Sequence, residues 1–385
     1  MWRRFLSILP AVIAGMSVSL AATPQFARQY QLDCSYCHVA PPRLNEQGIA
    51  FLANNYHFEG IRPMPSHTTV PVMIWSTVDV DRRHSANVTR GFLSRVEPVS
   101  IGRIGSTRAA YFIEWRAVSQ SVGGNQRLLN RSGRFEDLFV RFPITRRGNS
   151  LVVTAGQFRA LQQFDVSQRL SLSEPLAFSS GVPADAPARS ARLTGLRAFS
   201  PSNRQPALRL DYQRTAKGAS AADGWYTSVT LPLTGELTIP LAKAASFEFE
   251  NRLKGLFVES YTRRGTSTLG GHVFTGRDRR LGSVVVTHDI APRLALLGSV
   301  GRFWTPTAAD TRWSVGGEYV FSRFLIGGVR LDDRTAPNVN ASVLLYGNVH
   351  VPFGPAAFRQ ALKLQVEQRV QRRNHITTLG LSHIF

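Results

Sequence analysis

The sequence has only two cysteines among its 385 residues, and only four of its 46 basic residues are lysine. The remaining 42 are arginines, and with 25 acidic residues they leave a formal net charge of +21. These basic residues are spread along the whole chain, without the clustered patch or aromatic–basic stripe that is typical of nucleic-acid binders. The composition therefore argues against a nucleic-acid partner. It leaves anionic lipid, or a polar interior rich in guanidinium groups, as the reason for the charge.

Long apolar runs are also missing beyond the extreme N-terminus, so the mature chain is not expected to cross a membrane with helices. The N-terminus itself begins with Arg3 and Arg4, continues as an uncharged apolar stretch and reaches small residues near Ala21. This order predicts a secretory signal peptide at residues 1–21, cleaved after Ala21 or Ala22. An uncleaved membrane anchor is the alternative. The peptide holds only two basic residues, so the exported chain remains strongly basic.

The two cysteines lie together in the stretch Asp-Cys-Ser-Tyr-Cys-His, residues 33–38. In an exported protein two cysteines ordinarily form a disulfide. A zinc site would need a second Cys or His pair, and a thioredoxin-type redox pair would need a βαβ pattern, and neither is present. The C-x-x-C-H spacing is instead typical of covalent haem attachment. We therefore predict one haem c bound through Cys34 and Cys37, with His38 as the proximal axial ligand.

The residues after this motif predict a short helix over 45–55. A Pro-Pro pair at 41–42 prevents a helix from continuing directly after His38. Leu44, Gly48, Phe51 and Leu52 fall roughly on one face of the expected helix, where they could pack against a porphyrin. This pattern predicts a miniature cytochrome segment.

The second axial ligand is less well determined by the sequence. Three residues after the expected helix could reach the far side of the iron. We predict His57, which follows the helix directly, with Met64 or His67 as alternatives.

The rest of the chain alternates apolar and polar residues with the period of a β-strand. In residues 207–215, Leu208 and Leu210 share one face, and Arg209 and Asp211 share the other. The same alternation recurs in segments 111–116, 225–231, 325–331 and 361–370.

Two folds could use such strands. A soluble sandwich would hide the apolar faces, whereas a transmembrane barrel would turn them to lipid and the charges to its lumen. About 16 segments of about 9–12 residues fit the length of a tilted membrane-crossing strand. The chain also ends on Phe385 after an alternating run, as bacterial outer-membrane barrels do. We therefore predict a mainly β protein: an antiparallel outer-membrane barrel of about 16 strands over residues 68–385, whose lumen is plugged by an α-helical monohaem cytochrome c segment over 22–67.

One stretch interrupts this strand pattern. Between Phe158 and Arg189 no clean strand is apparent, and the stretch is longer than an ordinary turn. We expect a long external loop or a loop folded into the lumen.

Residues 24–51 resemble the start of the fused cytochrome–porin family of bacterial outer membranes. The matching features are F-A-R-x-Y, C-x-x-C-H, P-x-L-N and G-x-x-F, while the remainder agrees only in architecture. The resemblance implies an outer-membrane electron conduit with haem on Cys34 and Cys37 and His38 on the iron. It implies an extracellular donor, which in the best-known members is ferrous iron, a periplasmic soluble carrier as acceptor, and outer-membrane lipid around the barrel. The chain would then be a candidate ferrous iron:cytochrome oxidoreductase.

Two other functions fit the same sequence. One is an anion-selective diffusion porin whose haem segment is only a structural plug. The other is a periplasmic haem-binding sensor or carrier with a soluble β-domain.

The arginines bear on the haem as well. If those on one strand face line the lumen, their positive field would raise the haem potential, unless acidic residues on the same faces neutralise it. The arginines concerned are Arg116, Arg209, Arg330 and Arg369, and the acidic residues are Glu114, Asp211, Asp332 and Glu367.

Overall fold

The computed structural model describes most of the chain beyond the predicted signal peptide. The described residues are 24–41, 43–58, 60–64, 72–84, 87–105, 107–122, 128–130, 132–144, 149–159, 204–215, 223–233, 246–247, 255–276, 280–304, 309–335, 341–354, 360–371 and 374–385. The predicted signal peptide, His67 and most of the 158–189 stretch lie outside these residues.

The N-terminal segment is a string of short elements. They are α2 (Pro24–Tyr30), the 3-10 turn η1 (Cys34–Tyr36), β1 (His38–Ala40), β2 (Arg43–Leu44) and α3 (Glu46–Ala53). The predicted helix at 45–55 is thus confirmed as α3, with Asn45 as its N-cap. Among the described residues, no helix is long and apolar enough to span a membrane.

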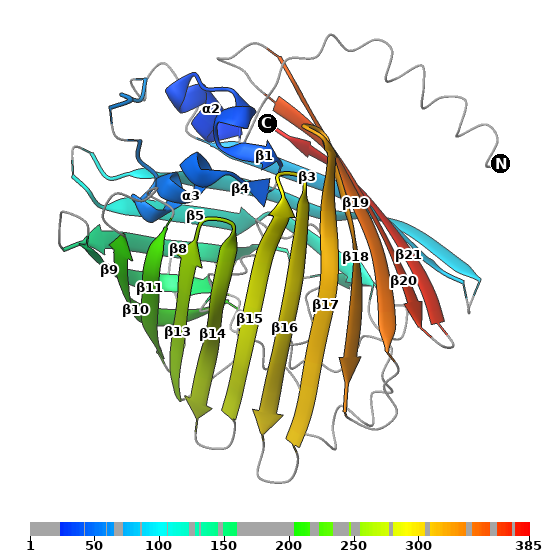
Figure 1. Ribbon diagram of the computed structural model, residues 1–385. Helices are drawn as coiled ribbons and strands as arrows, with labels where there is room; N and C mark the ends of the chain where they lie inside the picture. The colour runs from blue at the N-terminus through cyan, green and yellow to red at the C-terminus, as the bar shows by residue number, and fades with distance from the viewer. Residues whose placement is uncertain are drawn as a thin grey trace.

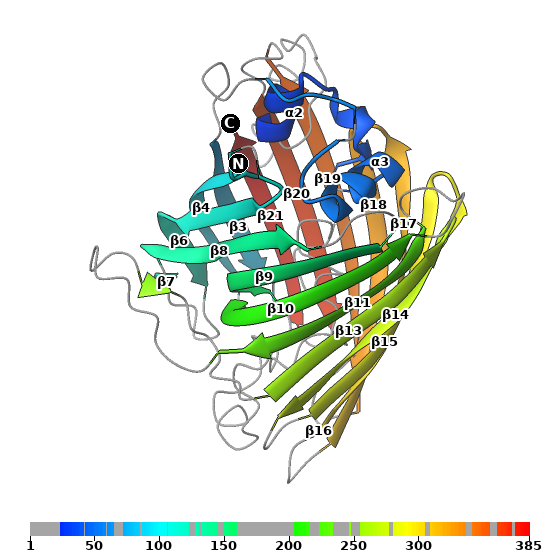
Figure 2. The same ribbon diagram turned by 90° about the vertical axis from the view of Figure 1, so that its left-hand side faces the viewer.

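The remainder forms a closed β-barrel (Figures 1 and 2). Its strands are β3 (Met73–Arg83), β4 (Val88–Arg103), β5 (Ala110–Arg116), β6 (Val118–Val122), β7 (Leu128–Asn130), β8 (Arg134–Pro143), β9 (Asn149–Arg159), β10 (Arg204–Thr215), β11 (Gly224–Pro232), β12 (Ser246–Phe247), β13 (Gly255–Arg264), β14 (Ser267–Gly276), β15 (Arg280–Ala291), β16 (Leu294–Trp304), β17 (Ala309–Ser322), β18 (Leu325–Arg334), β19 (Ser342–Phe353), β20 (Gln360–Gln371) and β21 (Asn374–Ile384). The short β6 and β7 continue β5 and β8 past a break, and the two-residue β12 pairs with β8, so the wall has 16 strands. The predicted strand number is therefore confirmed.

The barrel closes where β21 pairs with β3, and the principal strands are antiparallel to their neighbours. Phe385 takes part in this closure, because its backbone N–H and C=O each bond Ile74 at 2.9 Å. The terminal phenylalanine is thus a pairing residue of the wall. One local expectation was wrong: Phe158 and Arg159, placed in an irregular stretch by the sequence, belong to β9 and pair with β10.

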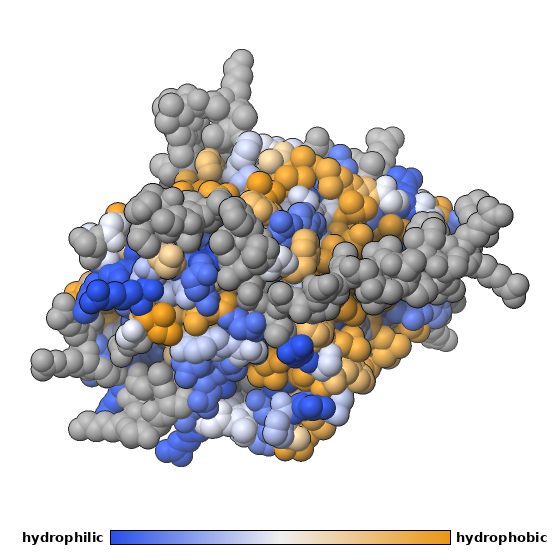
Figure 3. All heavy atoms as spheres, turned by 90° about the horizontal axis from the view of Figure 1, so that it is seen from above, coloured by the Kyte–Doolittle hydropathy of each residue, from blue (hydrophilic) through white to orange (hydrophobic). Residues whose placement is uncertain are grey.

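The strand faces are arranged inside out relative to a soluble protein. On β10, Leu208 and Leu210 are 44% and 45% exposed, whereas Arg209 and Asp211 are 1% and 3% exposed. Seen from the end that carries the N-terminal segment, hydrophobic residues gather along the outer wall, at the lower right of Figure 3. An apolar exterior around a polar, charged interior is the polarity of a transmembrane barrel and opposite to that of a soluble sandwich.

The N-terminal segment and the C-terminus lie at the same end of the barrel (Figures 1 and 2). Two-residue turns 265–266, 292–293 and 323–324 connect strands at this end. We call this end, with its turns and the N-terminal segment, the inner mouth.

Candidate functional site

The C-x-x-C-H motif forms a tight turn. Asp33 caps η1 by accepting hydrogen bonds from the backbone N–H and the hydroxyl of Ser35, at 3.1 and 3.0 Å. The Cys37 N–H then donates to the Cys34 carbonyl at 3.1 Å. The two cysteines are free thiols, Cys34 buried and Cys37 half-buried, so no disulfide joins them. Neither sulfur is therefore part of a disulfide.

Burial raises the pKa of the Cys37 thiol to about 11. Catalytic dithiol pairs need the opposite shift, because the thiolate is their nucleophile. The local electrostatics thus do not favour a thioredoxin-type redox function for this pair.

Helix α3 supports the motif from one side. Asn45 receives the Gly48 N–H on Oδ1 at 3.0 Å, while its own N–H donates to the Cys37 carbonyl at 2.9 Å. Its Nδ2 donates to the carbonyls of Ser35 and Tyr36, each at 3.1 Å. One asparagine therefore caps the helix and fixes the motif at the same time.

Gly48 lets the helix approach the motif closely. A Cβ on this residue would lie 2.3 Å from the Cys37 carbonyl oxygen. Two residues of the helix face that the sequence assigned to porphyrin packing have other neighbours in the structure. Gly48 lies against the backbone of the motif, and Phe51 packs in an aromatic cluster.

That aromatic cluster is the small core of the N-terminal segment. Phe51 stacks on Phe58 with ring centroids 4.4 Å apart, and Tyr30 meets Phe58 edge-on at 5.1 Å. Tyr36, from the motif itself, packs on Phe58 at 5.3 Å. The motif is therefore held by the segment's own packing.

The segment is attached to opposite walls of the inner mouth. Gln25 forms hydrogen bonds with the backbone of Ile101 on β4. Arg43 forms an ion pair with Asp289 on β15. These two strands are eight places apart in the ring of 16, which is the greatest separation such a ring allows. The segment therefore bridges the mouth from side to side.

Further contacts hold the segment between these points. Buried Arg28 donates to the Val72 carbonyl at 2.8 Å and lies over the ring of Phe385, 5.1 Å from its centroid. Asn55 donates to the Arg108 carbonyl at 3.1 Å. The segment, which the sequence predicted to be a plug of the lumen, is held by these contacts at the mouth of the barrel.

A cavity lies between the motif and the wall. The motif side is formed by Cys34, Ser35, His38, Val39 and Pro41. The wall side is formed by Arg323 and Phe324, on the β17–β18 turn, and by His350 and Pro352 on β19.

The donor set at this cavity fits a covalently attached haem: the Cys34 thiol and the His38 imidazole line it, and the Cys37 thiol lies in the same turn. The cavity is narrower than a porphyrin. The rim side chains of Arg323 and Phe324 would have to turn outward around the group.

The candidate distal ligands are placed less favourably. His57 is half-buried after α3 and does not line the described cavity, and its carbonyl accepts a hydrogen bond from Asn54 at 3.0 Å. Met64 is 42% exposed. His57 as the sixth ligand remains a prediction.

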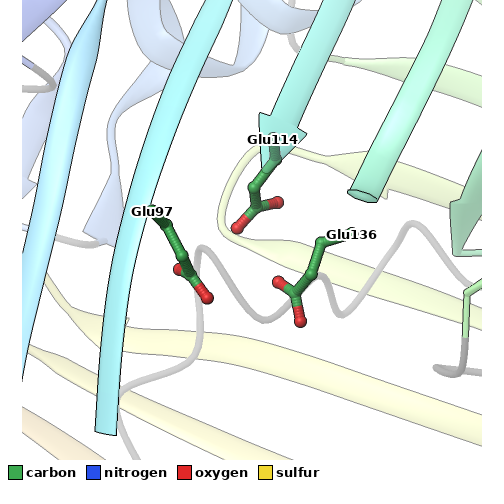
Figure 4. A group of neighbouring side chains, drawn as sticks. All are labelled: Glu97, Glu114 and Glu136. Atoms are coloured by element: carbon green, nitrogen blue, oxygen red, sulfur yellow. The ribbon is translucent and has the colours of Figure 1, made fainter. Parts of the chain in front are cut away.

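No carboxylate cluster is apparent in the sequence, but the structure contains one. Glu97, Glu114 and Glu136, from β4, β5 and β8, are buried, and their carboxylate oxygens lie within 4.8 Å of one another (Figure 4). Arg116 pairs with Glu97 at 3.1 Å and also with Glu136, and Arg95 reaches Glu97 at 3.3 Å. Strand register, which the sequence alone does not provide, brings these residues together. The arginines make the cluster a charge-paired network of the lumen.

Other lumen arginines are also paired. Arg209 Nε lies 2.9 Å from Asp211, and Arg330 Nε lies 2.8 Å from Asp332. Of the two possibilities that the sequence left open for these arginines, the structure shows neutralisation: at both positions an acidic neighbour on the same strand pairs with the guanidinium group.

Comparison with known proteins identifies the fold. No family model matches the chain, and a search of curated proteins finds no match. Among solved structures, OmpF from Salmonella typhi, in a complex with daunomycin, matches with a TM-score of 0.52 at 9% identity, covering 82% of this chain and 97% of that one. A porin variant from Rh. blastica matches with a TM-score of 0.45 at 10% identity, covering 82% of this chain and 99% of that one. An anion-selective porin from Comamonas acidovorans gives 0.46 at 12%, covering 82% and 98%. Of these three only the OmpF match exceeds a TM-score of 0.5, and at 9% identity it shows the fold alone, a barrel of the porin type.

Proposed function

We propose that this chain is an outer-membrane porin-type barrel that carries a c-type haem at its inner mouth and passes electrons from a small external donor to a periplasmic carrier. The observation that carries the proposal is the C-x-x-C-H segment fixed between opposite walls of the barrel. Cys34 and Cys37 would hold the haem through thioether bonds, and His38 would bind the iron. When attached, the haem supplies reversible one-electron transfer.

The inner mouth is assigned to the periplasm on the basis of its turns. In bacterial outer-membrane barrels the short turns are periplasmic and the longer loops extracellular. The two-residue turns 265–266, 292–293 and 323–324 share the end with the N-terminal segment. A soluble periplasmic cytochrome could therefore approach the motif directly.

The position at one mouth determines what kind of donor could reach the haem. The apolar band of such barrels is roughly 25 Å tall, and a group at the inner mouth leaves most of that height uncrossed. The donor must therefore be small enough to enter the lumen. Hydrated ferrous iron meets this requirement, and a wall lined with charged and hydroxyl groups would allow a hydrated ion to pass. The activity would be that of a ferrous iron:cytochrome oxidoreductase.

An anion-selective diffusion porin is the second candidate, and the fold favours it directly. The excess of arginine over acidic residues points the same way. The ion pairs of Arg209 and Arg330 argue against anion selectivity, because paired guanidinium groups attract anions less than unpaired ones. The third function, a soluble periplasmic carrier, conflicts with the exposed leucines of the barrel exterior.

A reduction assay in proteoliposomes tests the proposal. The protein, produced with haem-maturation machinery, should be coloured, and excess ferrous iron added outside should reduce its haem. A bulky ferrous chelate of similar potential, too large for the lumen, should reduce it much more slowly. The variant lacking both thiols, Cys34→Ser with Cys37→Ser, is the matched control.

Three results would count against parts of this proposal. A colourless wild-type protein with high ionic conductance and anion-selective reversal potentials would replace it with the diffusion porin. A haem reduced by dithionite but not by ferrous iron would exclude iron as the donor. Equal rates with the small and the bulky donor would exclude entry through the lumen.

A further inference from the structure

The wall of the barrel contributes a histidine to the cavity that contains the motif. His350 lies on β19, on the opposite side of this cavity from Cys34 and His38. It is separated from His38 by more than 300 residues of sequence. Only closure of the barrel over the N-terminal segment brings the two histidines together.

Strand parity directs the His350 side chain inward. Along β19 the buried residues alternate with more exposed ones, and Leu344, Tyr346, Asn348 and His350 are on the buried face. The His350 side chain therefore points toward the N-terminal segment, and 7% of the residue is exposed.

Two further observations concern the imidazole itself. It lines the same cavity as His38 and lies within electrostatic range of that residue. Its Nε2 is buried and has no hydrogen-bond partner among the described residues. A buried imidazole nitrogen that faces a cavity without a partner is free to bind a metal, and burying it without any partner is costly.

The position of His350 is rigid. Its backbone N–H donates to the Phe324 carbonyl at 2.8 Å, and it stands opposite Lys363 on β20. The motif is fixed to the same part of the wall, because Ala40, which ends β1, is buried in a cluster with Val320, Ile326, Leu344 and Tyr346. The separation between motif and His350 is thus determined by the fold, whereas His57 does not line the cavity and Met64 is solvent-exposed.

We infer that His350 is the second axial ligand of the haem iron, so that the iron is held between His38 of the N-terminal segment and a histidine of the barrel wall. This inference rests on the proposed function, since it requires the haem to be attached at Cys34 and Cys37. His350 thus takes the ligand position that the sequence predicted for His57, although its own sequence context does not mark it as a ligand.

Such ligation has two consequences. The iron would join the segment to the barrel, so that the inner mouth would be cross-linked through the metal. Two imidazole ligands also give a lower potential than the His/Met pair of many c-type cytochromes. Exchange of His350 for methionine is therefore expected to raise the potential.

Spectroscopy of full-length variants tests the inference. His350→Ala should keep its covalent haem, because Cys34, Cys37 and His38 are unchanged, but its oxidised haem should lose the low-spin signal of two-histidine ligation. Added imidazole should restore that signal. His350→Met should instead show a methionine–iron charge-transfer band and a higher potential. His57→Ala and His383→Ala, a matched histidine exposed on β21, should resemble wild type.

The outcomes separate the two proposals. A wild-type protein without covalent haem would overturn the proposed function and this inference together. A haem-bearing wild type whose low-spin signal survives His350→Ala, or is lost in His57→Ala instead, would overturn this inference alone. If His350→Ala does not fold, shown by loss of heat-modifiable gel migration, the His350→Met spectrum decides: an unchanged two-histidine spectrum refutes the assignment.

Discussion

Replacement of Gly48 by alanine should loosen helix α3 from the C-x-x-C-H turn. The new methyl group would lie 2.3 Å from the Cys37 carbonyl oxygen and 2.8 Å from Leu44 Cδ2. The leucine side chain can rotate away. The backbone oxygen cannot move unless α3 and the C-x-x-C-H turn separate.

Two effects of opposite sign determine the magnitude. Alanine is favoured over glycine inside a helix by about 1 kcal/mol. Overpacking against a fixed neighbour costs about 3 kcal/mol at the upper end of the usual range, which is appropriate for so short a backbone contact. The difference, about 2 kcal/mol, would raise the population of the state in which α3 is detached from the turn roughly 30-fold.

Hydrogen exchange of the α3 amides in detergent measures this population, because exchange requires the helix to open. Protection should fall in Gly48→Ala and not in Gly91→Ala, where the new methyl would meet only Val80 Cγ2 at 3.9 Å. Protection in Gly48→Ala equal to that of wild type would refute the close approach of α3 to the motif.

Three further predictions concern single side chains. Cys37→Ser should lose at least part of the haem-peroxidase staining at the monomer band of a denaturing gel, and full staining would show that Cys37 forms no thioether. Arg43→Ala should weaken attachment of the segment by about 1 kcal/mol or less, as expected for a partly exposed ion pair, measured by limited proteolysis near the N-terminus. Adding Asp289→Ala to it should have little further effect, and additive losses would show that the two residues act separately. Asp211→Ala should destabilise the barrel by about 3–5 kcal/mol in urea titrations followed by gel migration, because it removes the carboxylate that pairs with buried Arg209 at 2.9 Å. A stability equal to wild type would contradict the pairing.

The barrel could be predicted from local sequence because each strand carries its own signal. Leu208, Arg209, Leu210 and Asp211 alternate strictly, and the structure turns the leucines outward and the charges inward as this alternation requires. The α3 helix was equally accessible, since Leu44, Gly48, Phe51 and Leu52 fall on one helical face after the Pro-Pro pair. Both predictions depend on neighbours within a few residues.

The remaining features depend on contacts between distant parts of the chain. In the sequence, His350 is an ordinary polar residue of an alternating strand. Only the closed barrel places it across the cavity from His38. Glu97, Glu114 and Glu136 likewise lie on three strands whose register decides whether they meet. The register between strands that are far apart in the chain cannot be read from a single sequence. Neither the His38–His350 arrangement nor the glutamate cluster could therefore be found from the alternation pattern alone.

The spacing of the lumen ion pairs has a consequence for assembly. Arg209 and Asp211, Arg312 and Asp310, and Arg330 and Asp332 are each two residues apart on one strand, on the same face, with Nε–oxygen distances of 2.7–2.9 Å. Each such strand therefore brings its own counter-charge, and the pair can form before any neighbouring strand is in place. A hairpin entering the bilayer would carry each of these three pairs as a neutral dipole rather than as an isolated cation facing the hydrocarbon.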